Sequence, residues 1–168
     1  MHDPVTLPLV VRRARPDDAR TIADFNARMA SETEGKTLDL ERLAAGTRAV
    51  FEGRERGFYV VAERVGTVVG CLLVTREWSD WRNGWFWWIQ SVYVVPSARR
   101  GGIYRAMHVW LEAQARGAAG EGAPIVGLRL YVERENSSAM ATYEALGMHR
   151  AHYQLYERDF VLGEPRST

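Results

Sequence analysis

Two arginines and two glycines stand between a strand-like run and a helix-like run near the middle of the chain. The strand-like run ends at Val95-Pro96, Arg99-Arg100-Gly101-Gly102 follows, and apolar residues recur at helical spacing from Ile103. Backbone N–H groups at the positive end of a helix, glycines that allow close approach and cationic side chains together suit a pyrophosphate. The run matches neither G-x-x-x-x-G-K-[ST] nor G-x-G-x-x-G. The alternative is a plain joint whose glycines serve packing.

This segment resembles the acyl-CoA-binding motif of the GNAT superfamily of N-acetyltransferases, [QR]-x-x-G-x-[GA] after a strand that ends in V-x-P. Arg99 occupies the first motif position and Gly102 the second. Tyr104 stands where the family usually has glycine or alanine. Its side chain could crowd the pyrophosphate, point away from it or stack on part of the cofactor.

A second segment, 136–148, resembles the family's later motif N-x-x-A-x-x-x-Y-x-x-x-G-[FM]. Asn136, Ala139, Tyr143 and Gly147 fall at the matching positions. The two motifs occur in order on a strand–helix–strand–helix pattern, so the chain is identified as a member of this superfamily. The resemblance implies an acetyl-CoA-dependent N-acetyltransferase that transfers acetyl directly to an amine. The alternative is a catalytically silent acyl-CoA-binding or regulatory module on the same fold.

The resemblance also implies how acetyl-CoA would be held. The backbone of 92–94 would pair with the pantetheine arm where two parallel strands splay, and one of its N–H groups would polarise the thioester oxygen. Amides of 100–105 would hold the pyrophosphate. Asn136 would contact the pantetheine, or would serve as the N-cap of the next helix, or both. The implied cofactor-binding residues are Val92, Tyr93, Val94, Arg99, Arg100, Gly101, Gly102, Tyr104, Arg105 and Asn136.

Acid–base roles are assigned to three catalytic candidates. Tyr143 is the candidate general acid, because a phenol can protonate the leaving thiolate; the alternative is an aromatic that anchors the last helix. The candidate general bases are Glu34 and then Glu32, which we expect in a loop after the first helix. Glu77 and Asp80 are the runners-up. For each carboxylate, the alternative is a solvated surface residue.

Hydrophobic periodicity predicts the elements that must position these residues. Strands are expected over 9–14, 57–63, 68–75, 85–95, 125–132 and 149–160. Helices are expected from the Pro16 region to about 30, and over 39–52, 103–117 and 137–146, with polar linkers at 31–36 and 77–84. The order predicts an α/β (α+β) fold: a mixed, mostly antiparallel sheet with one parallel pair and helices on both faces. Residues 1–8 are expected to be a leader, 9–160 a single acetyltransferase domain and 161–168 a tail.

Five of the six tryptophans lie between Trp78 and Trp88. On a strand, Trp85, Trp87 and Ile89 point one way, and Phe86, Trp88 and Gln90 the other. One interpretation is a strand buried on both faces. A second is that Trp78, Trp81 and Trp88 wall an acceptor pocket that favours aromatic or cationic amines. A third is a homodimer interface.

Composition limits the partners. Lysine and arginine number 22 against 21 aspartates and glutamates, so the net charge of +1 provides no overall field for nucleic acid or an anionic membrane. The single cysteine, Cys71, excludes an intramolecular disulfide and is expected to be a small buried residue. The histidines show no metal-ligand spacing, so no metal is expected. No signal peptide or membrane segment is visible, and we expect a cytoplasmic protein.

Overall fold

The computed structural model describes residues 8–118 and 122–162. Its strands are β1 (Leu9–Arg13), β2 (Phe58–Arg64), β3 (Thr67–Ser79), β4 (Gly84–Val94) and β5 (Ile125–Leu130). Its helices are α1 (Ala19–Glu34), α2 (Leu40–Glu52), α3 (Ile103–Gly117) and α4 (Ser137–Ala145). The predicted leader and tail fall largely outside the described residues.

The chain divides into two compact units. Met1–Glu133 holds the sheet with α1, α2 and α3, and Arg134–Thr168 holds α4. That residues 9–160 form a single domain stays a prediction.

The five strands form one mixed sheet in the order β1-β2-β3-β4-β5. Strands β1 to β4 pair antiparallel, and β4 pairs with β5 in parallel. The turn between β2 and β3 places Val65 and Gly66 at φ angles of 50° and 76°, the left-handed pair that suits a two-residue hairpin. The sheet and its helices confirm the predicted fold class.

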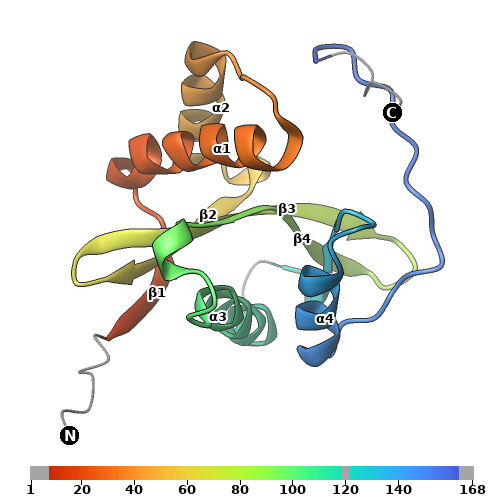
Figure 1. Cartoon of the computed structure of the whole chain (residues 1–168). Coiled ribbons are helices and arrows are strands. Elements are labelled where there is room, and N and C mark those ends of the chain that lie inside the picture. The colour runs from red at the N-terminus through yellow and green to blue at the C-terminus, as the bar shows by residue number, and fades with distance from the viewer. Residues whose placement is uncertain (1–7, 119–121, 163–168) are drawn as a thin grey trace, which may run out of the picture. The chain divides into compact units, whose positions relative to one another are not determined.

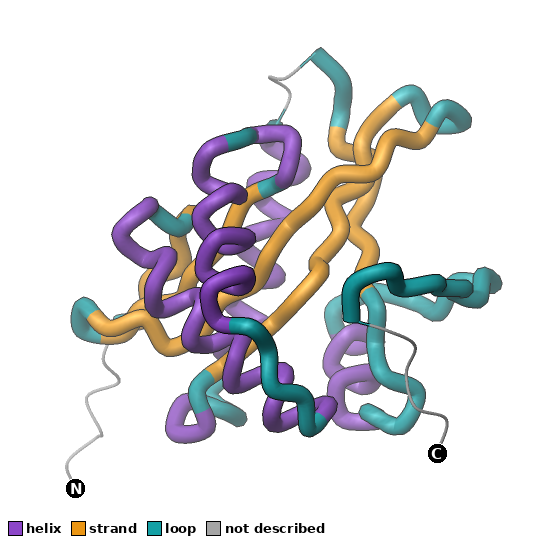
Figure 2. Tube along the Cα trace, turned by 90° about the horizontal axis from the view of Figure 1, so that it is seen from above, coloured by secondary structure: helices purple, strands orange, loops and turns teal. Residues whose placement is uncertain are grey.

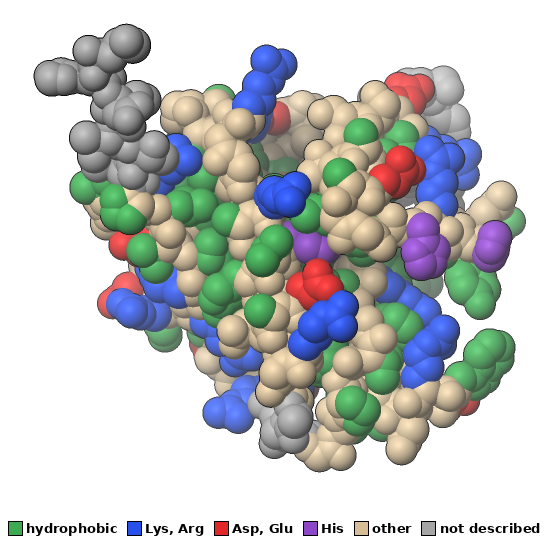
Figure 3. Space-filling model, turned by 90° about the horizontal axis from the view of Figure 1, so that it is seen from below, with side chains coloured by type: hydrophobic (Ala, Val, Ile, Leu, Met, Phe, Trp, Pro, Cys, Tyr) green, Lys and Arg blue, Asp and Glu red, His purple; other side chains and the backbone are tan. Residues whose placement is uncertain are grey.

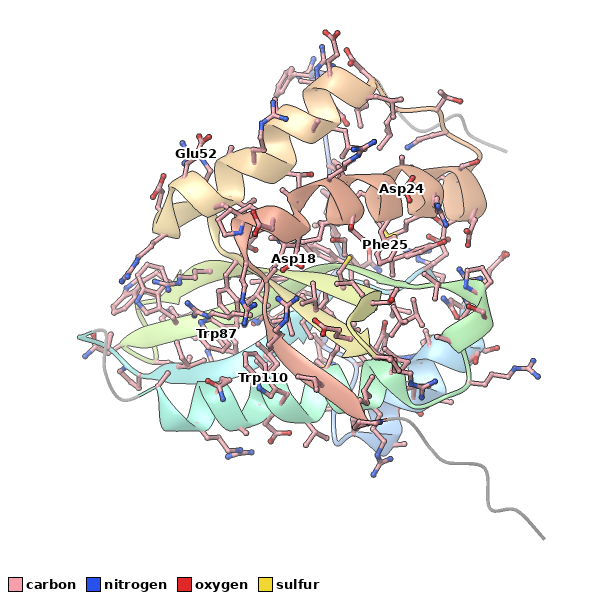
Figure 4. The ribbon with its side chains drawn as sticks, turned by 90° about the vertical axis from the view of Figure 1, so that its left-hand side faces the viewer. Asp18, Asp24, Phe25, Glu52, Trp87 and Trp110 are labelled. Atoms are coloured by element: carbon pink, nitrogen blue, oxygen red, sulfur yellow. The ribbon has the colours of Figure 1, made fainter. Side chains whose placement is uncertain are left out.

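Helices cover both faces of this sheet (Figure 1). On one face α1 packs Ile22 and Phe25 against Tyr93 and Cys71, and the Phe25 and Tyr93 rings lie 5.1 Å apart. Figure 4 shows Phe25 between α1 and the sheet. Cys71 is only 1% exposed, and burial raises its thiol pKa to about 12, as expected for an inert core residue.

On the opposite face α3 packs against the larger part of the core. Met107 and Leu111 of α3 are fully buried against Leu72 and Val74 of β3 and Trp87 of β4. Figure 4 shows the labelled Trp87 and Trp110 in the layer between sheet and helix. α3 therefore covers this face of β3 and β4.

The end of α1 corrects one sequence prediction. The polar run after residue 30 was expected to be a loop, but α1 continues to Glu34. The Thr33 hydroxyl donates to the Met29 carbonyl oxygen at 2.7 Å, and Gly35, at φ 61°, ends the helix with its N–H directed to the Ala30 and Ser31 carbonyls. A polar run can continue a helix when it lies on the solvent side, so Glu32 and Glu34 sit in the last helical turn.

Half of the tryptophan-rich linker predicted over 77–84 is strand. β3 runs on to Ser79, β4 begins at Gly84, and a tight turn over 80–83 joins them, with Asn83 at φ 48°. The prediction was wrong because exposed polar residues on one face of a long hairpin resemble a loop in sequence.

The strand predicted over 149–160 is also wrong, because no strand occurs among the described residues after β5. Alternating residues there resemble a strand, yet Tyr153, Tyr156 and Phe160 are more than 80% exposed. A strand forms only where a neighbouring strand satisfies its backbone groups, and the sheet pairing includes no residue of this segment.

Within the described residues, no helix is long and apolar enough to cross a membrane. The face in Figure 3 carries acidic and basic side chains interspersed, with no single field of one sign. This agrees with the near-neutral net charge.

Candidate active site

Within the described residues the second half of β4 is paired on one side only, and we call this stretch the open edge. The first half pairs with β5 from Trp85 to Ile89, whereas in the described parts of the chain no β5 residue pairs with 90–94. The two parallel strands therefore part after Ile89. Backbone groups of 90–94 that face away from β3 are left without a partner strand among those described, and one of them, the Val94 carbonyl oxygen, accepts from the Arg99 side chain.

A β-bulge marks the point where the strands part. Across from β3, Leu73 pairs with Ser91 and Val74 with Ile89, which leaves Gln90 as the extra residue. The bulge changes which positions face α3, from Trp87 and Ile89 before it to Val92 and Val94 after it. An unbroken alternation, as predicted from the sequence, therefore holds only for the first half of β4.

The segment after β4 presents the N-terminal end of α3. Gly102 is the N-cap at φ 71°, and Arg100 before it also has a left-handed φ, of 62°. The first bond into the helix runs from the Ala106 N–H to the Gly102 carbonyl at 2.9 Å, so the N–H groups of 103–105 have no partner within the helix. Together these groups form a concentrated positive end suited to an anion.

Arginines surround this helix end. Arg100 and Arg105 are exposed and make no ion pair within the described residues. Arg64 of β2 directs its Nη2 to the Gly101 carbonyl at 3.5 Å, and a Cβ at Gly101 would come 3.2 Å from that nitrogen. A glycine at 101 thus lets a third guanidinium lie against the loop.

Three residues that the sequence assigned to different roles meet at the end of α1. The Glu32 carboxylate accepts from the Tyr93 hydroxyl at 2.8 Å and from Arg99 Nη2 at 2.5 Å. Arg99 Nε also donates to the Val94 carbonyl oxygen at 2.9 Å. Glu32 therefore links α1 both to Tyr93 on the open edge and to Arg99.

This network sets the charge state of its members. The Arg99 hydrogen bond, and then that of Tyr93, lower the pKa of Glu32, whereas burial and the Glu32 carboxylate raise the pKa of Tyr93. A carboxylate with a lowered pKa is a weak proton acceptor. Glu34, by contrast, pairs with Lys36 at 2.5 Å and makes no contact with this network.

Tyr104 stands at the motif position where this chain differs from the family, and its side chain contacts a residue of its own helix. Its hydroxyl lies 3.2 Å from Nδ1 of His108, one helical turn on, and its ring packs against the core cluster below the sheet. His108 is 2% exposed, and burial lowers its pKa, so the imidazole is neutral and can accept the phenol hydrogen. Among the alternatives raised by the sequence, this geometry is that of a side chain pointing away from the helix end.

The donor set fits the diphosphate and pantetheine of acetyl-CoA. The open edge of β4, Arg100 and Arg105, and the N-terminus of α3 lie along one segment, and in the part of the chain that the structure describes neither arginine forms an ion pair. Backbone groups would pair with amides, and N–H groups and guanidinium groups with phosphate oxygens.

The second motif lies in the other unit, around α4. The Asn136 side-chain oxygen accepts from the Ala139 N–H at 3.0 Å, so Asn136 caps the helix as one of its two expected roles. Burial raises the pKa of Tyr143, which keeps the phenol protonated near neutral pH. A protonated phenol is the form that a general acid needs.

Comparison with known proteins supplies the family. The acetyltransferase (GNAT) family profile matches residues 21–148. A crystal structure of a possible acetyltransferase from Clostridium difficile 630 is 44% identical, with 91% of this chain and 98% of that chain covered and a TM-score of 0.81. The chain belongs to the GNAT acetyltransferase family. It is an N-acetyltransferase by family.

More distant structures share the fold of this acetyltransferase. A ribosomal-protein-alanine N-acetyltransferase from Brucella melitensis biovar Abortus 2308 is 17% identical, with a TM-score of 0.70 over 91% of this chain and 100% of that one. An aminoglycoside N-acetyltransferase in complex with CoA is 10% identical, with a TM-score of 0.74 over 95% of this chain and 99% of that one. No curated protein matches the sequence.

The structure separates the tryptophans of the acetyltransferase into two sets. Trp78 pairs with Trp85 across the hairpin, with ring centroids 4.9 Å apart, on the α3 side of the sheet. Trp88 lies on the opposite face, and Trp81 is 86% exposed at the hairpin tip. The hypothesis that Trp78, Trp81 and Trp88 wall one pocket is therefore wrong.

Sequence reasoning named Glu77 only as a runner-up base, and it missed Arg129 and Tyr131, which also surround Trp88. Glu77, Arg129 and Tyr131 meet it from β3, from β5 and from just beyond β5. No sequence signal identifies them together, because the parallel register of β4 and β5 brings Arg129 opposite Trp88.

A cavity of about 360 Å³ lies elsewhere, between the sheet and the last turns of α3. Its lining includes Arg76, Trp85, Trp87 and Gln114, and none of the predicted cofactor residues. Nor do the described residues contain a cluster of histidine, cysteine or carboxylate side chains that could hold a metal ion.

Proposed function

We propose that this acetyltransferase takes acetyl-CoA as donor and transfers the acetyl group directly to an amine. The observation that carries the proposal is the continuity of two features on one segment. The open edge of β4 over 90–94 leads within a few residues to the α3 N-terminus and its unpaired Arg100 and Arg105. In CoA, an extended arm that carries amides is followed by a diphosphate. The order of these groups matches the order of the open edge and the α3 N-terminus.

Each part of the segment has a distinct task. The backbone of Val92, Tyr93 and Val94 pairs with the pantetheine amides as an added strand, and an N–H of this stretch donates to the thioester oxygen as charge develops there. The N–H groups of 102–105 and the side chains of Arg100 and Arg105 bind the phosphates. Acetyl-CoA supplies the activated acyl group.

In the transfer the neutral amine nitrogen forms a bond to the thioester carbon, and the carbon–sulfur bond breaks. The ammonium loses one proton to water before the attack. Tyr143 then gives its hydroxyl proton to the departing sulfur, and the second proton, which the nitrogen loses as the amide forms, returns through water to the Tyr143 phenolate. Asn136 orients the pantetheine in addition to capping α4. The placement of Tyr143 and Asn136 in this step follows from the family motif.

Glu32 holds Arg99 and Tyr93 in place rather than serving as the base. Its pKa is lowered by the groups it binds, so it holds a proton weakly. The amine then loses its proton through water, with Glu34 as the remaining carboxylate candidate of the predicted pair. An unchanged pH–rate profile in Glu34→Gln would assign that proton to water alone.

Binding and turnover are tested separately. Calorimetric titration with acetyl-CoA is expected to show binding that weakens about 10-fold or more in Arg100→Gln/Arg105→Gln, because two charge-assisted contacts are lost. Arg116→Gln, at the other end of α3, is the matched control. Thiol release from acetyl-CoA with a panel of amines measures turnover. Binding without release for every amine would favour the silent module, and no binding would overturn the proposal.

A further inference from the structure

An aromatic platform, formed by Trp88 and Tyr131, lies where β4 and β5 part. Their ring centroids are 4.5 Å apart at an interplanar angle of 40°. Trp88 precedes Ile89, the last β4 residue paired with β5, and Tyr131 is the first residue after β5. The platform therefore borders the open edge from the side of both strands.

Polar contacts hold the platform in place. The Glu77 carboxylate accepts from the Trp88 indole N–H and from Arg129 Nη1, the latter at 2.9 Å. The Arg129 guanidinium also stacks over Phe86 at 3.7 Å from the ring centroid. Gly127 permits this arrangement, because a Cβ there would lie 2.6 Å from the Phe86 ring. The indole plane is thus fixed before any ligand arrives.

The platform remains accessible to a ligand. Tyr131 is 47% exposed and Trp88 is half-buried, whereas Phe86 is 8% exposed beneath Arg129. Figure 2 shows α1 and α2 over one part of the sheet and the β3–β4 hairpin reaching past them. On the other face α3 packs against the core under β4, whereas the platform lies on the face opposite α3.

The charge around the platform does not suit a polycation. Glu77 is neutralised by Arg129, and Glu32 by Arg99. Glu133, two residues beyond Tyr131, is exposed and makes no ion pair or hydrogen bond within the described residues. Two aromatic rings whose contacting carboxylate is already neutralised match a ligand with an aromatic ring and a single ammonium group.

We infer that the acceptor is an arylalkylamine, a primary amine joined by a short aliphatic linker to an aromatic ring. The ring packs on Trp88 and Tyr131, and the amine reaches past them to the open edge of β4. This inference rests on the proposed acetyl transfer and adds the chemical class of the acceptor.

The test compares kcat/KM for phenethylamine and cyclohexylethylamine, which share a linker and differ in aromaticity. Hexylamine and spermidine represent linear and polycationic amines. Aromatic pairs add roughly 0.5–1.5 kcal/mol beyond area burial, so phenethylamine is expected to be preferred over cyclohexylethylamine by about 2- to 12-fold. Spermidine is expected to be the poorest acceptor.

Variants separate the platform from a general apolar surface. Tyr131→Leu, at an exposed position where folding is not at risk, is expected to bring the phenyl-to-cyclohexyl ratio close to one, as is Trp88→Leu. Trp81→Leu removes an exposed tryptophan at the hairpin tip and is expected to leave the ratio unchanged. An unaltered ratio in both platform variants would overturn the inference.

The two proposals fail in different ways. Efficient acetylation of hexylamine or spermidine with poor use of phenethylamine would overturn the arylalkylamine assignment and leave acetyl transfer intact. If no amine releases CoA, acetyl transfer is overturned, and phenethylamine binding in the presence of CoA is then measured by saturation-transfer NMR. Binding lost in Tyr131→Leu would support the platform as an aryl site, and no binding would remove it.

Discussion

The two halves of β4 differ in what lies beside them, and the difference separates stability from chemistry. The first half, Trp85–Ile89, has β3 on one side and β5 on the other, and Trp87 and Ile89 are almost fully buried. Within the described residues the second half pairs with β3 alone, and it leads to the α3 N-terminus. One extra residue, Gln90, separates them. A single strand can therefore anchor a core and present an edge, provided that a bulge resets which side chains face inward.

The largest expected effect is on stability, when a buried side chain of the paired half of β4 is removed. Trp87→Ala should lower the free energy of unfolding by about 3–5 kcal/mol, because an almost fully buried indole leaves a cavity against α3. Gln90→Ala, at the exposed bulge, should change it by only about 0.5 kcal/mol. Urea denaturation measures both, and equal losses would contradict the division of β4.

Removing the proposed proton donor tests the chemical step and leaves the paired half of β4 unchanged. Tyr143→Phe should lower kcat by about 100-fold or more, since a general acid contributes at least that much. Acetyl-CoA affinity and the melting temperature should stay near wild type. Tyr153→Phe, an 81% exposed tyrosine in the same unit, is the control. Unchanged turnover in Tyr143→Phe would remove this residue from the mechanism.

The contacts of Glu32 in α1 with Tyr93 and Arg99 predict a smaller effect, on acetyl-CoA binding. Glu32→Gln and Arg99→Gln should each weaken acetyl-CoA binding by about two- to fivefold, the scale of exposed ion pairs, and the double variant should be no worse than the poorer single one. Asp24→Asn breaks another exposed pair on the same helix, Asp24–Arg28, and should leave binding unchanged. Additive losses in the double variant would show that Glu32 and Arg99 act separately.

The smallest expected effect is the pH dependence of stability that His108 of α3 causes. Burial lowers the pKa of His108, so the unfolded chain binds this proton more readily than the folded one. Stability is therefore full above the ordinary histidine pKa and declines as the pH falls below it. Urea unfolding between about pH 7.5 and 5.5 should show a shallower decline in His108→Gln than in wild type. A steeper decline in the variant would reverse the assigned protonation state.

Local patterns identified most of the helices and strands correctly because their periodicity and their ends are encoded nearby. Asp39 caps α2 through the Glu41 and Arg42 N–H groups, and Val65-Gly66 forms the β2–β3 turn. Two errors occurred where a polar run had two possible structures: residues 31–34 extended α1, and 77–79 extended β3. A third occurred over 149–160, where alternating residues lacked a strand partner.

The sequence by itself determined the family and the mixed sheet and predicted a cofactor segment, because each depends on residues close together in the chain. Only the tertiary structure decided that Glu32 binds Arg99 and Tyr93 and that Tyr104 turns to His108. It alone placed Tyr131 against Trp88. These contacts depend on how α1 ends, on the bulge at Gln90 and on the parallel register of β5, which the packing of distant segments fixes.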